Sequence, residues 1–220
     1  VFAFYVLWLA FPYILILYLI KYIKSNYKNE RGIGSGRYLS NINKGTYGET
    51  LTFFELEKIP AYSRILTNVY LPTENGTTEL DLVYLTTSGI YVIESKNFSG
   101  WIFGNEKQRN WTSIIYKTKH KFFNPIWQNR KHVKYLKKAL GDVHTPSIIV
   151  FSQRCELKKL EVGNKIVIKR NHVRQVIKQE LSNQVYIQNE IDSFYYELKK
   201  YSNQSDEVKK THIENLNVKE

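Results

Sequence analysis

The sequence has little of several residue types, and each shortage excludes something. It contains one cysteine, Cys155, in 220 residues, so no intrachain disulfide can form. This fits a reducing compartment, where a lone thiol more often packs as a small core side chain than acts as a nucleophile. Methionine is absent. Val1 is therefore not an initiator residue, and we expect the chain to begin upstream of it.

Charged side chains are missing from residues 1–20. Phe, Leu, Ile, Val, Tyr and Ala fill nearly all of this stretch. A helix of that length rises about 1.5 Å per residue and spans the roughly 30 Å hydrocarbon core of a bilayer. A buried helix of a soluble protein is the alternative, but such helices usually carry a polar face. We therefore predict a transmembrane helix over residues 1–20.

The residues that follow this apolar stretch predict its orientation. Basic side chains outnumber acidic ones there: Lys21, Lys24, Lys28, Arg31 and Arg37 against Glu30. Basic flanks lie on the cytoplasmic side of membrane spans. We expect a single-pass protein of the cell membrane, with its N-terminus outside and its domain in the cytoplasm. A cleaved signal peptide is the alternative, but its charge would precede the apolar run, and small residues would end it.

Acidic residues are missing from a second stretch, between Lys107 and Gly141. The formal net charge of the chain is +12, and this stretch carries much of it. Its basic residues are Lys107, Arg109, Lys117, Lys119, Lys121, Arg130, Lys131, Lys134, Lys137 and Lys138. Membrane topology and anionic lipid account for the first basic cluster, whereas this one predicts a polyanionic partner. A solvated face on a basic protein is the alternative.

The hydrophobic pattern predicts an α/β domain with a mixed sheet. Strands are predicted over 65–71, 79–85, 89–96, 101–103, 111–117, 146–151 and 165–168, and helices over 46–59, 124–140, 171–181 and 185–201. A turn over 87–89 makes the second and third strands an antiparallel hairpin. Asn124 is predicted to cap the second helix, with Pro125 in its first turn.

Three residues of this hairpin carry the chemistry. Positions i and i+2 of a strand point to one face, so Glu94 and Lys96 project together, and Asp81 is within reach across the hairpin. Neighbouring carboxylates repel and favour a hard divalent cation such as Mg²⁺ or Mn²⁺. Such a cation can polarise a phosphate oxygen and lower the pKa of water, while Lys96 stabilises developing charge. The alternative is two separate strand carboxylates, with Lys96 in an ordinary salt bridge.

Two predicted helices contribute further candidate residues for the active site and for phosphate binding. Glu49 shares a helical stripe with Phe53 and Leu56, where a carboxylate is costly unless it is paired or binds metal. A first-turn acid that complements the helix dipole is the alternative. Gln128 and His132 lie together beside the buried stripe of helix 124–140. The opposite side of that helix carries the candidate phosphate contacts Arg130, Lys131, Lys134, Lys137 and Lys138.

Taken in order, these segments resemble the NERD (nuclease-related) domain, a branch of the PD-(D/E)xK nuclease superfamily. The resemblance covers about Lys44 to Ser152, half of the chain. It is carried by Gly48-Glu49, Glu79-Leu80-Asp81, Gly89-Ile90-Tyr91-Val92-Ile93-Glu94-Ser95-Lys96-Asn97 with Gly100, Trp111, and Asn124-Pro125-Ile126-Trp127-Gln128. The departures are small: Ser95 stands where Thr is common, Leu80 where Ile is common, and Leu82 where His is often found.

The resemblance implies a restriction-endonuclease-like core, in which helices flank a mixed central sheet. It implies that Asp81 and Glu94 bind the metal with the aid of Glu49, that Lys96 is the catalytic lysine, and that Gln128 faces the active site. The expected parts of the chain are a transmembrane helix (1–20), a basic juxtamembrane linker (21–43), the nuclease-like domain (44–152), its C-terminal extension (153–203) and a polar tail (204–220).

We therefore expect a membrane-anchored nuclease that uses Mg²⁺ or Mn²⁺ to hydrolyse phosphodiester bonds in nucleic acid, with DNA as the expected substrate. Two alternatives stay open. One is a catalytically silent module that holds nucleic acid at the membrane. The other is a membrane-associated interaction protein whose basic surface binds anionic lipid.

Overall fold

The structure is a computed structural model that describes residues 44–202. The predicted transmembrane helix over 1–20, the juxtamembrane linker over 21–43 and the polar tail over 204–220 lie outside these residues. Between residues 44 and 202, no helix combines the length and the apolar character needed to cross a bilayer.

The described residues form a mixed α/β fold, as the sequence predicts. The strands are β1 (Ser63–Thr73), β2 (Gly76–Thr86), β3 (Gly89–Lys96), β4 (Gly100–Asn105), β5 (Asn110–Ile115), β6 (Thr118–Phe123), β7 (Ser147–Phe151), β8 (Cys155–Glu161) and β9 (Ile166–Lys169). The helices are α2 (Lys44–Glu57), α3 (Pro125–Leu140), α4 (Val173–Glu180) and α5 (Gln188–Ser202). A short 3-10 turn, Arg170–His172, precedes α4.

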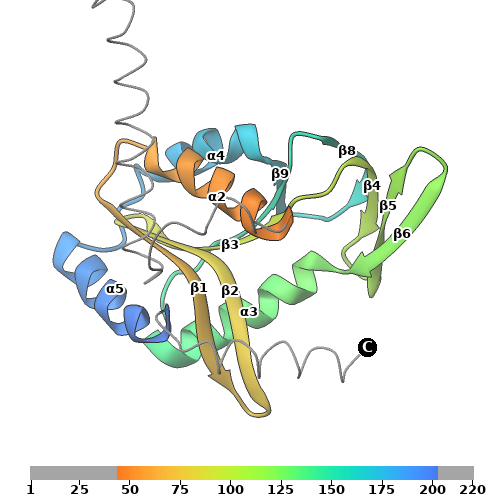
Figure 1. The fold of residues 1–220 in the computed structure, drawn as a ribbon. Coiled ribbons are helices and arrows are strands. Elements are labelled where there is room, and N and C mark those ends of the chain that lie inside the picture. The colour runs from red at the N-terminus through yellow and green to blue at the C-terminus, as the bar shows by residue number, and fades with distance from the viewer. Residues whose placement is uncertain (1–43, 203–220) are drawn as a thin grey trace, which may run out of the picture. The chain divides into compact units, whose positions relative to one another are not determined.

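The first sheet has five strands in the order β1-β2-β3-β7-β9. Strands β1, β2 and β3 are antiparallel neighbours, which confirms the predicted hairpin, and β7 and β9 continue the sheet in parallel. Helices α2 and α4 cover one face of this sheet, and α3 and α5 cover the other (Figure 1). The central strands are therefore buried on both sides.

The largest apolar core lies where α3 and α5 pack on this sheet. Its fully buried side chains include Leu66, Val83, Leu85, Val92, Leu136, Ile191 and Leu198. Burial of each such side chain contributes about 1.5–3 kcal/mol. This core therefore holds the strands that end at the candidate site.

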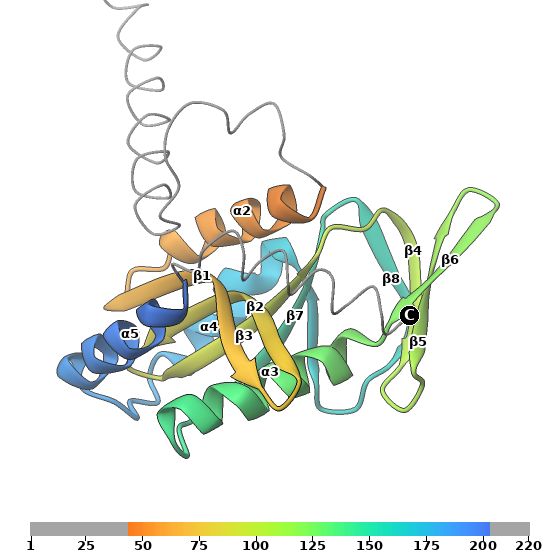
Figure 2. The same ribbon diagram turned by 60° about the horizontal axis from the view of Figure 1, so that its bottom comes forward.

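The second sheet has four strands in the order β6-β5-β4-β8, with β8 parallel to β4. Figure 2 shows it beside the N-terminal end of α3. Neither β6 nor β8 is predicted from the sequence. Almost every residue of β6 is exposed, so no apolar alternation marks it. A register shift in the ladder between Ile102 and Phe103 interrupts the pairing of β8 with β4.

Trp111 joins the second sheet to the first. Its fully buried ring stacks on Phe151 of β7, with the ring centroids 6.2 Å apart and the planes 3° from parallel. Gly104 on the neighbouring strand leaves room for this ring, because a Cβ there would lie 2.1 Å from it. The indole N–H donates to the backbone oxygen of Asn105 at 3.0 Å.

Asn124 fixes the start of α3, as its predicted capping role requires. Its Oδ1 accepts a hydrogen bond from the Ile126 N–H at 2.9 Å. Its Nδ2 donates to the backbone oxygens of Gln108 at 2.7 Å, Glu106 at 3.2 Å and Asn105 at 3.3 Å. The buried amide thus ties the first turn of α3 to the loop between β4 and β5.

Candidate active site

The β2–β3 hairpin brings Asp81 and Glu94 to the same place. The ladder of β2 and β3 ends at the pair Leu82–Ile93, so Asp81 and Glu94 are the residues directly beyond it on the two strands. Asp81 Oδ2 accepts a hydrogen bond from the backbone N–H of Ser95 at 2.9 Å. Both carboxylates therefore stand on one face of the sheet, where its apolar core ends.

Strand β1 is irregular beside Asp81. The pairing of β1 with β2 skips Asn68, whose φ of 52° lies in the left-handed region that L side chains rarely adopt. Asn68 Nδ2 donates to Glu79 Oε1 at 2.5 Å, and the Tyr70 hydroxyl donates to the same oxygen at 2.7 Å. Backbone strain of this kind persists only where the surroundings hold it, and it clusters at functional sites.

Lys96 joins the hairpin to α3. Its Nζ lies 2.7 Å from Glu94 Oε1 and donates a hydrogen bond to Gln128 Oε1 at 3.0 Å. The Glu94 side chain is 1% exposed and that of Lys96 is 20% exposed. The structure thus brings together Glu94, Lys96 and Gln128, although more than thirty residues separate the strand from the helix position.

Helix α3 also places His132 against Glu94. His132 Nδ1 lies 3.3 Å from Glu94 Oε2, and both side chains are almost completely buried. Neither atom has a hydrogen bond of good geometry within residues 44–202. Sequence reasoning places His132 beside Gln128 but not among the site residues. The signal for it is its position one helical turn after Gln128.

Helix α2 supplies Glu49. Gly48 lets this helix approach the end of β3, because a Cβ there would lie 2.6 Å from the Cβ of Asn97. Thr52 Oγ1 and Ser95 Oγ share a hydrogen bond at 3.3 Å, which also fixes α2 beside the site. From this position the charge of Glu49 raises the pKa of both Asp81 and Lys96.

Burial and neighbouring charges shift the pKa values of the cluster residues in opposite directions. Burial raises the pKa of Asp81 well above its usual value, and the neighbouring Glu94 and Glu49 raise it further. Burial also raises the pKa of Glu94, but Lys96 and His132 outweigh it and bring that pKa to about 2. Burial lowers the pKa of Lys96, but the carboxylates raise it more. Glu94 and Lys96 are thus both charged, whereas Asp81 holds a proton more readily.

These residues fit a divalent cation of the Mg²⁺ type. No cluster of three or more His, Cys, Asp or Glu side chains with metal-binding geometry occurs among the described residues. Mg²⁺, however, is commonly bound through one or two carboxylates, with water completing its shell. Asp81 and Glu94 supply two such groups, and Glu94 Oε2 lacks a hydrogen bond within residues 44–202. A cation here would relieve the repulsion that now raises the pKa of Asp81.

The predicted phosphate contacts form a basic row on the outer side of α3. Arg130, Lys131, Lys134 and Lys138 are exposed, and Lys137 is half-buried. Two members already hold carboxylates: Lys137 Nζ lies 2.7 Å from Asp142, and Lys138 Nζ lies 2.5 Å from Glu74. The row is therefore accessible, but part of its charge is neutralised within the protein.

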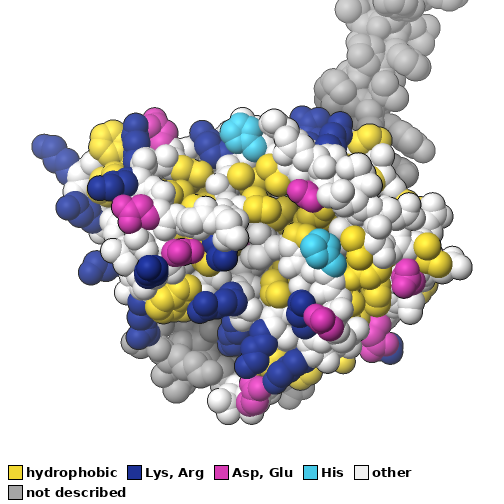
Figure 3. Space-filling model, turned by 180° about the vertical axis from the view of Figure 1, so that it is seen from behind, with side chains coloured by type: hydrophobic (Ala, Val, Ile, Leu, Met, Phe, Trp, Pro, Cys, Tyr) yellow, Lys and Arg dark blue, Asp and Glu magenta, His cyan; other side chains and the backbone are white. Residues whose placement is uncertain are grey.

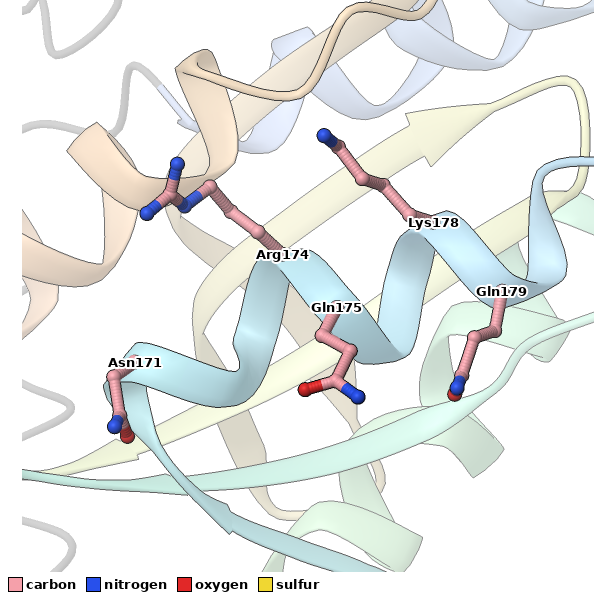
Figure 4. A pocket seen from close by; sticks show the side chains of 5 residues that line it. All are labelled: Asn171, Arg174, Gln175, Lys178 and Gln179. Atoms are coloured by element: carbon pink, nitrogen blue, oxygen red, sulfur yellow. The ribbon is translucent and has the colours of Figure 1, made fainter.

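A shallow hollow on α4 is separate from this cluster. Its lining residues are Asn171, Arg174, Gln175, Lys178 and Gln179 (Figure 4). Arg174 Nε lies 2.9 Å from Glu55 Oε2, so this guanidinium ties α4 to α2. Helix α4 and α3 cover opposite faces of the first sheet (Figure 1). The hollow is therefore not part of the candidate active site.

Comparison with known proteins identifies the family. The model of the nuclease-related domain, NERD, matches residues 44–152. An uncharacterized protein of Bacillus anthracis is 32% identical over 182 residues, which cover 80% of this chain and 85% of that protein. No solved structure matches. The chain belongs to the nuclease-related domain (NERD) family, within the PD-(D/E)xK nuclease-like superfamily.

Proposed function

We propose that this chain is a metal-dependent nuclease that hydrolyses phosphodiester bonds in nucleic acid, with DNA as its substrate. The observation that carries the proposal is the partly buried cluster at the end of the β2–β3 hairpin. There Lys96 Nζ lies 2.7 Å from Glu94 and 3.0 Å from Gln128, and the charge of Glu94 raises the pKa of the nearby Asp81. Membership of a nuclease-related family supports the same reading.

Asp81 and Glu94 would hold Mg²⁺ or Mn²⁺, with Glu49 adding negative charge from α2. When bound, the cation supplies polarisation of a phosphate oxygen and a lowered pKa for water. Lys96 stabilises the negative charge that develops on the phosphoryl oxygens. Gln128 fixes the Lys96 side chain through its 3.0 Å hydrogen bond.

The basic row on α3 would hold the substrate. Its members, Arg130, Lys131, Lys134, Lys137 and Lys138, would contact phosphates without reading base sequence, because phosphate contacts carry no sequence information. The apolar residues 1–20 and the basic flank after them support a membrane anchor with the domain in the cytoplasm.

A cleavage assay on the full chain in detergent tests the proposal. Supercoiled plasmid and a single-stranded oligonucleotide are incubated with Mg²⁺, Mn²⁺ or EDTA. Because Lys96 stabilises charge in the transition state, Lys96→Ala is expected to lower the metal-dependent rate about 100-fold or more. The matched control is Lys178→Ala, an exposed lysine on α4, which is expected to cut like the wild type. Equal cutting by the Lys96→Ala protein would contradict the proposal.

The silent binding module is the second candidate, because the basic row does not depend on the carboxylate cluster. It predicts no cutting by the wild type with either metal, together with a salt-sensitive shift of DNA in a gel. This shift would persist in Asp81→Asn. Binding of the wild type that is much stronger to anionic than to neutral vesicles, with little preference for DNA, would instead favour a lipid-binding surface.

A further inference from the structure

A second groove runs along the side of α3 that faces away from Gln128. It has a volume of about 650 Å³ and lies between α3, the loop after β4 and the starts of β7 and β9. Its lining residues are Glu106, Lys107, Ile126, Trp127, Arg130, Val133, Thr145, Ser147 and Lys165. Figure 3 shows the molecule from behind, and Lys and Arg side chains gather on the part of this surface that covers α3 and the second sheet.

Helical geometry separates this groove from the active site. Ile126, Arg130 and Val133 are three or four residues apart and therefore share one flank of α3. Gln128 and Tyr135 share the opposite flank, which faces Lys96 and β1. The groove contains none of the residues of the carboxylate–lysine cluster.

An aromatic ring with a fixed orientation lines the groove. Trp127 Nε1 donates to the backbone oxygen of Glu106 at 2.7 Å. The Phe123 ring lies at 75° to the indole with the ring centroids 6.2 Å apart, and the Arg130 guanidinium lies 6.0 Å from the indole centroid. Phe123 is 45% exposed. These aromatic rings and the guanidinium offer a surface on which a flat π-system can stack.

The polar groups of the groove suit an anion with hydrogen-bonding atoms. Lys107, Arg130 and Lys165 stand against one acid, Glu106, whose carboxylate is directed toward Gly163. Thr145 Oγ1 is buried and has no hydrogen-bond partner within the described chain. A buried hydroxyl of this kind is normally paired, and a ligand in the groove could pair with it.

We propose that this groove binds an unpaired nucleotide of the nucleic acid substrate, with its base stacked on Trp127 and its phosphate held by Lys107, Arg130 and Lys165. The proposal rests on the proposed function, since it gives the substrate a single-stranded segment that lies across α3 from the carboxylate–lysine cluster. An aromatic face selects single strands because a base must leave its duplex stack to lie on it. A duplex can offer this groove only its phosphates.

Binding of a fluorescent twelve-residue oligothymidylate to the full chain tests this, by anisotropy in EDTA so that nothing is cut. Lys107→Ala/Lys165→Ala removes two exposed cations of the groove. It is expected to weaken binding about tenfold and to reduce the slope of log affinity against log salt by up to roughly 0.7, because both lysines hold the same phosphate and one phosphate contact contributes about 0.7. The control Lys158→Ala/Lys178→Ala removes two exposed cations elsewhere and is expected to bind like the wild type.

Stacking is tested at Trp127 itself. Trp127→Leu is expected to weaken oligothymidylate binding about tenfold, whereas Trp127→Phe keeps an aromatic face and stays within about threefold of the wild type. A duplex of the same length is expected to respond little to either change. Equal losses for duplex and single strand, or wild-type binding by Trp127→Leu, would overturn the proposal.

The outcome is independent of catalysis. If the wild type cuts plasmid but does not bind oligothymidylate, the proposed nucleotide site is wrong and the proposed nuclease activity is supported. If the wild type binds oligothymidylate through Trp127 and Lys165 but never cuts, the proposed nucleotide site is supported and the proposed nuclease activity is contradicted.

Discussion

Asp81 is the residue at which function and stability conflict most directly. Its folded-state pKa is raised by burial, Glu94 and Glu49, so its protonated form stabilises the fold. That contribution is fully present below the pKa of the unfolded chain and is lost as pH rises through the folded pKa. Above the pKa of the unfolded chain, the Asp81 carboxyl group therefore destabilises the metal-free protein, and a bound cation would relieve this cost.

Replacing Asp81 by Asn is expected to raise the melting temperature of the metal-free protein by a few degrees at pH 8, or about 1 kcal/mol, because the repulsion disappears. The same change should abolish the stabilisation that Mg²⁺ gives the wild type. Thermal melts in EDTA and in Mg²⁺ measure both effects. Asp142→Asn is the control, since this exposed carboxylate pairs with Lys137 and should gain nothing. A lower melting temperature for Asp81→Asn in EDTA would refute the argument.

His132 acts through Glu94, because its Nδ1 lies 3.3 Å from that carboxylate. We expect His132→Ala to raise the Mg²⁺ concentration needed for half-maximal cleavage about tenfold, as loss of such supporting groups does in metal sites. The rate at saturating Mg²⁺ should change only a few-fold. The exposed His172 provides a control substitution, His172→Ala. A fall in the saturated rate with unchanged metal dependence would argue against a positioning role.

The site residues differ in how far the sequence predicts them. Asp81, Glu94 and Lys96 follow from strand alternation and a short turn, which are local features, and the structure brings them together. His132 depends on the rotation of α3 about its axis, which the packing of the whole helix sets. The left-handed Asn68 leaves no sequence signal, since asparagine is common in ordinary loops.

The start of helix α3 depends on a single side chain. Asn124 makes four hydrogen bonds to backbone groups and is fully buried. Asn124→Ala is expected to lower the free energy of unfolding by about 2–3 kcal/mol, because it removes a helix cap and the hydrogen bonds from Nδ2 to three backbone carbonyls. Urea denaturation measures the change.

Two further substitutions sharpen this prediction. Asn124→Asp keeps the acceptor for the Ile126 N–H but turns a negative charge toward three carbonyls, so it should not restore stability. Asn183→Ala alters an exposed amide that pairs with Glu180 and should cost under about 0.5 kcal/mol. If Asn124→Asp matched the wild type, the hydrogen bonds from Nδ2 to the loop after β4 would be unimportant.

The helices and strands, like the site residues, are predicted well where local sequence sets them and poorly where distant contacts do. Strands β2 and β3 and helix α3 are predicted within a few residues, because hydrophobic period, turn and cap agree in each. Strand β6 is stabilised by pairing with β5 while its Lys119 and Lys121 side chains remain in solvent. Nothing in its composition distinguishes it from a polar loop.

At the scale of the molecule, the net charge of +12 should govern association with DNA. Replacing Arg130, Lys131 and Lys134 by Ala is expected to reduce the salt slope of duplex binding by roughly 2–3, at about 0.9 per phosphate contact. Lys137→Ala/Lys138→Ala should change it less, because Asp142 and Glu74 already neutralise these lysines. Gel shifts across a salt series measure both slopes. A larger effect from the second pair would show that the ion pairs open on binding.

Helix α3 has a consequence for how this protein can diversify. Its buried side contacts the sheet through Asn129, which donates to the Val92 carbonyl at 2.9 Å. One flank of the helix contacts Lys96 through Gln128. The other flank lines the groove. A single mutation in this helix is therefore pleiotropic. Residues that stabilise the fold, residues of the candidate active site and residues that would contact the substrate alternate along it. We expect heritable changes in substrate preference to accumulate in β6 and the turn before it, where almost every side chain is exposed.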